Sequence, residues 1–492
     1  MVAVSLATLA ALLLLAPLSR SGQLPVAGLV LQWLALGLLI TSLWERDKIP
    51  LRRIEIWGLT LLLLYPLVYL IPIPAALVGL FPGRDLYLAT DDLFGSDVTR
   101  GFVQLALVPA ETQAAWLFLL VPVAVYVGTH LLDPRGAERF VWLLLAIAAL
   151  QAALGLMQYG AGAGPLYFGL DHAHGNAVGT FTNRNHLAGL LAMTLPLALA
   201  LLVYSVGQRP RDRGNHWKER ILFLGSLRGH VAVGYAAIVL LLILAVVFTR
   251  SRAGIALTML GILLATFAYA RRLGGTNVYG LTGTLVTAAI GLGLVIGLAP
   301  VLDRFTVTGA IEDARWTINA ATLEGIRHFL PFGSGPGGYA EVFPAYQPVE
   351  LGRYFINHAH NDYLQWLFEG GLLAALLMLF FAVLYLRQWS RVWTPGAWTR
   401  MRFIQVAAGI GLLLGALHSL VEFHLHIPAN LIYFAFLAGL FFSDLSHVEE
   451  RTAARRRRRR TPDLDSDTRS PSLSAVPRPT PPPDQIRNPF LD

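Results

Sequence analysis

The chain has 492 residues, of which 55% are hydrophobic and only 14% are charged, and its formal net charge is +8 at pH 7. This composition is too apolar for a soluble protein and indicates a polytopic membrane protein. The sequence has no cysteine, so neither a disulfide nor a thiolate nucleophile or metal ligand can contribute. The excess of positive charge comes mostly from basic loops and a basic tail, and it gives no reason to expect nucleic-acid binding.

Apolar runs of roughly 18 to 25 residues, the length that a helix needs to cross a hydrocarbon core, recur along most of the chain. They predict an all-α transmembrane domain over residues 1–446 with about twelve spans. The first run has no basic segment before it and no small-residue cleavage site after it, so we expect a span rather than a cleaved signal peptide. The predicted spans are 2–18, 26–44, 56–80, 113–132, 140–158, 186–206, 231–249, 253–270, 281–301, 367–387, 403–421 and 427–443.

The basic residues predict the orientation of these spans. An even number of spans puts both termini on one side, and the tail carries six consecutive arginines, Arg455–Arg460. Because basic residues collect in cytoplasmic loops, we expect both termini in the cytoplasm and the long loop 302–361, between the ninth and tenth spans, on the outer face. An arginine run beside a membrane is typical of contact with anionic lipid. Residues 447–492, rich in proline, serine and charge, predict a disordered basic cytoplasmic tail.

Two short outward-facing segments carry unexpected polar and basic residues. Arg184 and Asn185 lie at the mouth of the sixth span, where they either contact a substrate or belong to a capped helix start. Arg250 and Arg252 lie in the short turn between the seventh and eighth spans, against the positive-inside bias. They could reach lipid phosphates, but Gly254 leaves room beside Arg252 and a guanidinium holds phosphate well, so we favour phosphate binding.

The long outer loop is the third such segment. Its glycine-rich stretch 331–339, PFGSGPGGY, could bring backbone amides close to an anion, although it lacks the lysine and hydroxyl residue of a nucleotide-binding loop. The stretch before it begins near Arg315 and has residues spaced to fall on one face of a helix, which predicts an amphipathic helix on or near the bilayer surface. The residues with this spacing are Trp316, Ala320, Leu323 and Ile326/Arg327.

The loop ends in a polar patch, 356–371, with the sequence INHAHNDYLQWLFEGG, where the tenth span begins. Titratable groups at the mouth of a membrane helix usually serve a function. Histidine is the side chain most readily available as a base near neutral pH. Because His358 and His360 are two residues apart, we expect their side chains to diverge, one acting in function and the other supporting it. Asn361 is a further candidate for substrate contact.

A second histidine cluster surrounds the last outer turn. His418, Glu422 and His426 are spaced i, i+4, i+8, so they could hold a metal if one helix ran through all three. The same spacing also makes an ordinary hydrogen-bonded polar patch. We favour a role for Glu422 as the carboxylate that orients a catalytic group, and we expect no metal site.

Together these segments resemble the O-antigen ligase and O-antigen polymerase superfamily of bacterial envelope membrane proteins, over about residues 181–443. The most specific element is a histidine followed by Asn, Ser or Gln, nine residues and Gly-x-x-small, found here as His360, Asn361 and Gly371–Ala374. The long outer loop before the tenth span and the Ser251–Gly254 turn also agree with the family pattern.

The resemblance implies a C-type membrane glycosyltransferase-like fold and an inverting, metal-independent transfer, without a cofactor, from an undecaprenyl-diphosphate-linked glycan on the periplasmic face of the bacterial inner membrane. By position, His360 would be the general base, and Arg252 and Arg315 would bind and neutralise the diphosphate leaving group. The further candidates for substrate binding are Arg184, Asn185, Arg250, His358, Asn361 and Glu422.

Three functions remain open from the sequence. The favoured one is a ligase that transfers the glycan to a lipid A core, and the second is a polymerase that joins lipid-linked repeat units into O-antigen or exopolysaccharide. The third is a transporter, which would need charged or interrupted helices near the membrane midplane. The predicted spans carry almost no ionisable residues at their centres, and this argues against transport.

Overall fold

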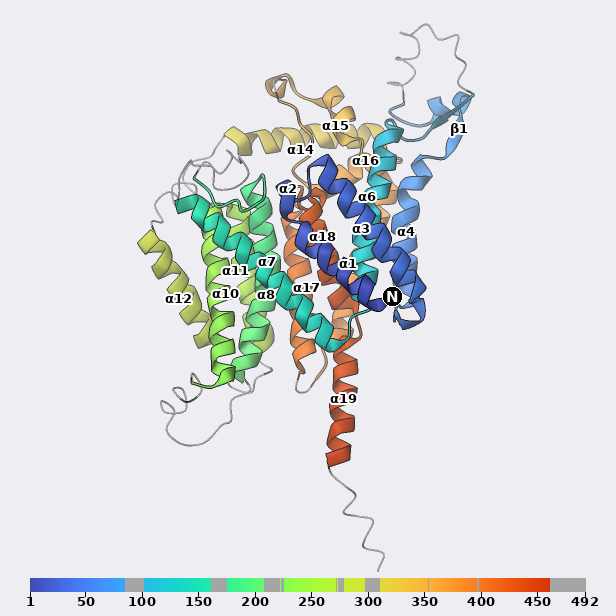
Figure 1. Ribbon diagram of the computed structural model, residues 1–492. Coiled ribbons are helices and arrows are strands. Elements are labelled where there is room, and N and C mark those ends of the chain that lie inside the picture. Colours follow the sequence, from blue (N-terminus) through green and yellow to red (C-terminus); the bar gives the residue numbers. More distant parts are fainter. Residues whose placement is uncertain are drawn as a thin grey trace, which may run out of the picture.

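The computed structural model describes residues 1–84, 101–160, 175–207, 222, 225–270, 272, 278–296, 310–352, 354–395 and 398–460. Most of these residues lie in helices that stand side by side as a bundle (Figure 1). The bundle helices are α1 (Val2–Leu15), α3 (Pro25–Trp44), α4 (Arg53–Tyr69), α6 (Pro109–Thr129), α7 (Pro134–Gly160), α8 (Arg184–Gly207), α10 (Leu227–Thr249), α11 (Arg252–Ala270), α12 (Val278–Ile296), α16 (Asp362–Val392), α17 (Arg400–His418) and α18 (Pro428–Phe442).

A helix overlaps each of the predicted spans. Within the described part of the chain, eight helices are long and apolar enough to cross a membrane, and α18 with the bent continuation α19 (Leu445–Arg460) is a ninth candidate. The protein is therefore an all-α multi-pass membrane protein, while the number of twelve spans stays a prediction. Residues 297–309 and 461–492, which include part of the predicted outer loop and most of the predicted disordered tail, lie outside the described residues. The beginning of that tail, up to Arg460, lies in helix α19.

The third predicted span is too long. Its helix, α4, ends at Tyr69, and the apolar residues after it form the short strand β1 (Pro72–Pro74) and the 3-10 helix η2 (Ala75–Leu80). β1 pairs antiparallel with β2 (Phe102–Gln104). The two prolines explain the difference, because proline lacks the N–H that continues a helix and pushes the preceding residue into an extended conformation.

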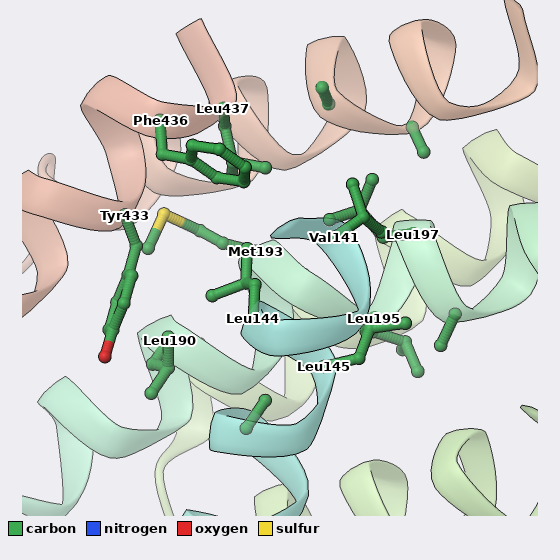
Figure 2. Packing of buried hydrophobic residues seen from close by; sticks show 14 of the residues in the cluster. Val141, Leu144, Leu145, Leu190, Met193, Leu195, Leu197, Tyr433, Phe436 and Leu437 are labelled. Atoms are coloured by element: carbon green, nitrogen blue, oxygen red, sulfur yellow. The ribbon is translucent and has the colours of Figure 1, made fainter. Parts of the chain in front are cut away.

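Helix α8 lies at the centre of the bundle. In its most apolar stretch 94% of the residues are buried, against 83% for α17 and 22% for α3, which is peripheral. Figure 2 shows Leu190, Met193 and Leu197 of α8 packed among side chains of α7 and α18. Because the first turn of α8 carries two of the candidate site residues, this packing gives the site a rigid support.

The long outer loop folds across one end of the bundle. Helix α14 (Ala310–Phe329) lies over the ends of the vertical helices (Figure 1). Trp316, Ala320 and Leu323 are exposed on it, as the predicted amphipathic pattern requires, whereas Ile326 is buried. After α14 come α15 (Tyr339–Val342) and the 3-10 helices η3 (Phe343–Tyr346) and η4 (Val349–Leu351); η5 (His424–His426) precedes α18, and α2 (Leu18–Ser21) and η1 (Arg46–Lys48) lie near the N-terminus.

The glycine-rich stretch packs against a kink in α16. At this kink Gly371 has φ 50°, and a Cβ there would lie 2.2 Å from the carbonyl oxygen of Pro331. The N–H of Gly335 donates to the carbonyl of Glu369, and the N–H of Gly337 donates to the Glu369 carboxylate. These amides therefore dock the loop on α16. The positive φ of Gly371 and the close approach of the Pro331 carbonyl explain why the histidine motif ends in glycine.

Candidate functional site

The turn between α17 and α18 holds the carboxylate around which the site is built. α17 ends at His418, and Glu422 in the turn is only 1% exposed. Its Oε2 accepts hydrogen bonds from Arg315 Nη2 at 2.7 Å and from Asn185 Nδ2 at 2.6 Å. Its Oε1 lies 2.7 Å from His360 Nδ1. Three residues that the sequence singled out separately therefore meet on one carboxylate.

Each partner of Glu422 comes from a different element. Asn185 lies in the first turn of α8, Arg315 lies on α14, and His360 comes shortly before α16. The start of α16 is fixed by Asn361, whose side-chain oxygen accepts from the backbone N–H groups of the first turn and so acts as an N-cap. His360 itself has φ 53°, a left-handed conformation that costs about 1 kcal/mol or more outside glycine.

The charges around Glu422 keep its carboxyl group ionised. Burial alone would raise the pKa of Glu422, but the hydrogen bond from His360 and the charge of Arg315 outweigh burial and hold this pKa well below its ordinary value. An ionised carboxylate can only accept, so the proton on the His360 ring lies on Nδ1. In the neutral form of this ring the other nitrogen, Nε2, carries the lone pair and can take a proton from a hydroxyl group.

Phe423 is the ring against which three histidines pack. His358 stacks on it with centroids 4.3 Å apart, and His360 meets it at 4.9 Å with the planes at 74°. His186 of α8 approaches it at 4.7 Å. Both histidines of the motif contact Phe423, but His358 faces Gln365 and His426 whereas His360 faces Glu422, and His360 has a left-handed backbone.

The supporting histidine of the motif is His358. Burial lowers its pKa to about 3, so its ring is neutral near pH 7. Its Nδ1 lies 3.2 Å from Gln365 Oε1, and its ring centroid lies 5.0 Å from that of His426. These contacts hold His358 within the protein, two residues before His360.

A second carboxylate ties the beginning of α16 to the same turn. Asp362 Oδ1 lies 2.5 Å from His426 Nδ1, and Asp362 Oδ2 accepts from the N–H of Leu425 at 2.9 Å. Burial would lower the pKa of His426, but its bond to Asp362 outweighs burial and raises that pKa. Asp362 thus fastens the segment that carries His360 to the turn that carries Glu422.

Behind Glu422 lies a buried group of histidines. His418 of α17 and His424 stack with centroids 5.0 Å apart, and His424 Nδ1 lies 3.1 Å from Asn430 Nδ2. Gly189 of α8 makes room for them, since a Cβ there would lie 2.2 Å from His424 Cε1. Among the described residues, neither ring nitrogen of His186 or His418 has a hydrogen-bond partner. Buried polar atoms of this kind are normally satisfied by internal water.

The α10–α11 turn, which carries two arginines, packs near the start of α8. Arg250 ends α10 with φ 56°, and Arg252 begins α11. A Cβ on Gly254 would lie 2.4 Å from Ala188 Cβ, so α11 packs closely on α8 one turn after Asn185. The α10–α11 turn and the Glu422 cluster therefore both lie near the start of α8. Arg184, at the start of α8, donates to Asn176 Oδ1 at 2.9 Å.

The i, i+4, i+8 pattern of the last outer turn does not form one helical face. The helix stops at His418, which stacks on His424, while Glu422 turns to His360 and His426 turns to Asp362. The predicted orienting role of Glu422 agrees with this geometry. Sequence reasoning missed Phe423, because an isolated phenylalanine beside a membrane span carries no signal of its own, and it missed the pairing of Asp362 with His426.

Comparison with protein families gives one match. Residues 237–379 match the family model described as O-antigen ligase. This segment runs from α10 into α16 and contains Arg252, Arg315 and His360, whereas Asn185 and Glu422 lie outside it. No curated protein matches the chain.

Proposed function

We propose that this protein, which matches the O-antigen ligase family model over residues 237–379, transfers an undecaprenyl-diphosphate-linked glycan to a hydroxyl group of a lipid A core or a similar acceptor. The transfer inverts the anomeric centre and needs no metal ion. The observation that carries the proposal is the contact of one buried carboxylate, Glu422, with both His360 and Arg315.

In the proposed reaction His360 is the general base. Its Nε2 takes the proton of the acceptor hydroxyl while the hydroxyl oxygen attacks the anomeric carbon. The bond between that carbon and the diphosphate oxygen breaks, and the electron pair leaves with the diphosphate. Glu422 keeps the Nδ1–H tautomer in place and stabilises the imidazolium that forms, as the carboxylate of a catalytic triad does.

The arginines neutralise the leaving group. Arg315 donates to Glu422 and to the carbonyl of Val421, and its Nε has no hydrogen-bond partner among the described residues. One of its donors is therefore not used by any described residue, and Arg252 at the start of α11 supplies a second guanidinium. Positioning and charge neutralisation of this kind supply much of the rate when the leaving group is good.

The proposed location follows from the charge of the loops. The end of the bundle with α14 would face the periplasm, and the opposite end, with the basic loops and α19, would face the cytoplasm of a bacterial inner membrane. The N-terminus lies 3.8 Å from Glu45 at the end of α3. Arg52, which lies between α3 and α4, donates a hydrogen bond to Gln388 near the end of α16. The N-terminus and the end of α16 therefore lie at the same end of the bundle.

The test is a reaction in nanodiscs with a purified undecaprenyl-diphosphate glycan as donor. One arm offers lipid A core as acceptor, and the other offers a second lipid-linked unit. A single larger lipid A product supports ligation, whereas a ladder of lengthened lipid-linked glycans would show a polymerase instead. Appearance of intact donor on the opposite leaflet without any product would show a transporter.

A further inference from the structure

A polar cavity lies at the end of the bundle opposite the site. It has a volume of about 410 Å³ and is formed where the end of α16 meets the start of α17 and the α18–α19 bend. Helix α17 connects the two ends of the bundle. Its last residue, His418, lies behind Glu422, and its residue Arg402 lines the cavity. His418 and Arg402 are sixteen residues apart, which is roughly 24 Å at 1.5 Å per residue. Its lining includes Ser390, Arg391, Thr394, Arg402, Gln405 and Asp444.

The cavity has the chemistry of a phosphate site. Its described lining has two arginines against one carboxylate, Asp444, together with hydroxyl groups from Ser390 and Thr394. Arg402 is buried, with a side chain that is only 1% exposed, and its Nε has no hydrogen-bond partner among the described residues. Arg402 already pairs with Glu450 through Nη2 at 2.9 Å, and a guanidinium has several donors with which it can also hold a phosphate.

The wall of the cavity is held by hydrogen bonds, so the site does not have to form when a ligand arrives. Arg402 Nη1 donates to the carbonyl of Val392 at 3.4 Å and Nη2 donates to Glu450 at 2.9 Å. The side-chain amide of Gln405 donates to the carbonyls of Phe441 and Ser443 at 2.9 and 2.8 Å. These bonds join α17 to the end of α18 and to α19. A preorganised wall reduces the entropic cost of binding.

Aromatic side chains place the cavity at the depth of the lipid headgroups. Trp393 and Trp398 lie in the segment that joins α16 to α17, directly after the lining residues of α16. The guanidinium of Arg272 lies 5.3 Å from the Trp393 ring and 4.5 Å from the Trp398 ring. Tryptophan and arginine gather where a span meets the polar headgroups. A lipid that binds here would therefore place its headgroup, rather than its acyl chains, in the cavity.

We propose that this cavity binds the phosphate headgroup of an anionic membrane lipid, with Arg391 and Arg402 as its cationic contacts. Basic pockets between spans on the cytoplasmic side are suited to such headgroups, and the inner leaflet supplies them. The volume agrees with a headgroup-sized ligand. The inference concerns the face opposite His360 and stands whether or not the proposed transfer reaction is correct.

The experiment measures retained lipid on the full-length protein by native mass spectrometry. The delipidated protein is titrated with phosphatidylglycerol or with phosphatidylcholine in the same detergent, and a third arm offers only glycerol phosphate. Arg391→Gln is the test variant, because Arg391 is exposed and its loss should not disturb folding. Arg387→Gln is the matched control, since Arg387 is an exposed arginine one turn earlier on α16 and is not in the lining.

We expect Arg391→Gln to weaken phosphatidylglycerol binding about fivefold, the effect of about 1 kcal/mol per basic residue near a membrane surface, and Arg387→Gln to leave it unchanged. Asp444→Asn, which removes the acidic lining residue, should tighten binding by a similar factor. Equal binding by the Arg391 and Arg387 variants, or equal retention of phosphatidylcholine, would overturn the proposal. Displacement of the lipid by glycerol phosphate at comparable concentration would assign the cavity to a soluble phosphate ester instead.

Discussion

Replacing Glu422 by glutamine tests the orientation of the proposed base. Glu422 is buried and its Oε1 lies 2.7 Å from His360 Nδ1, so the carboxylate selects the Nδ1–H tautomer. Glutamine has nearly the same shape, but its amide N–H₂ can turn to His360 and favour the tautomer that is protonated on Nε2. A ring in that state cannot accept the proton of the acceptor hydroxyl.

The expected loss is large. Removal of a general base costs about 10² to 10⁴ in rate, and the wrong tautomer in a catalytic triad costs about 10⁴. We therefore expect kcat of Glu422→Gln to fall by about 10² to 10⁴, equivalent to about 2.7–5.5 kcal/mol of activation free energy. Single-turnover transfer in nanodiscs measures this, with thermal unfolding as the folding control. Glu324→Gln, an exposed carboxyl on α14, is the matched control. A rate for folded Glu422→Gln within threefold of wild type would refute the reasoning.

Four further predictions follow from the same contacts. Phe423→Leu removes the ring that packs on His360, so kcat should fall by up to about tenfold while KM for the donor stays unchanged. The control is Phe343→Leu, which changes a phenylalanine of a separate hydrophobic cluster and should leave kcat of the folded protein unchanged. Gly371→Ala places a Cβ against the Pro331 carbonyl at a positive φ and should cost about 2–4 kcal/mol of stability in thermal unfolding, while Gly283→Ala, where a Cβ meets nothing, should cost little. The folded-state pKa of His426 is raised, so the stability that its pair with Asp362 contributes is full below about pH 6.5 and is lost as pH rises through the raised pKa. The difference in unfolding free energy between wild type and Asp362→Asn should therefore shrink at alkaline pH. A difference that stays constant with pH would contradict the pairing. Treatment with EDTA should leave the transfer rate unchanged, and loss of activity that a divalent metal restores would contradict neutralisation by arginines.

The pH dependence of Glu422 has the opposite sign. Its folded-state pKa lies below the ordinary value near 4.5, so the stability that it contributes is full above about pH 4.5 and is lost as pH falls through the lowered value. The stability advantage of wild type over Glu422→Gln should therefore be constant near neutral pH and decline only in acid.

Hydropathy predicted the helices well, because a span must be apolar along its whole length. It failed at 72–80, where the residues are equally apolar but two prolines end the helix. The sequence also could not show how far the polar patch enters the helix. α16 begins at Asp362, before the predicted span, because Asn361 caps it and the polar residues after it are buried against the outer loop and the α17–α18 turn.

The candidate site was predictable residue by residue but not as an arrangement. The spacing of His360 to Gly371 led to the prediction that His360 is the base, and the structure gives that glycine a physical reason in the kink of α16. The meeting of Asn185, Arg315 and His360 on Glu422 depends on contacts between residues up to 237 positions apart, which no local pattern records. The left-handed backbone at His360 is a further feature that β or α periodicity cannot anticipate.

The most direct test of the proposed mechanism is the single-turnover rate of glycan transfer by His360→Ala, measured beside His328→Ala, which changes a histidine of α14 that bonds to Tyr346 away from the site. The mechanism predicts that His360→Ala binds the lipid-diphosphate donor but transfers its glycan about 10² to 10⁴ times more slowly than wild type, while His328→Ala transfers it at the wild-type rate. Full transfer activity in folded His360→Ala would contradict the assignment of the base.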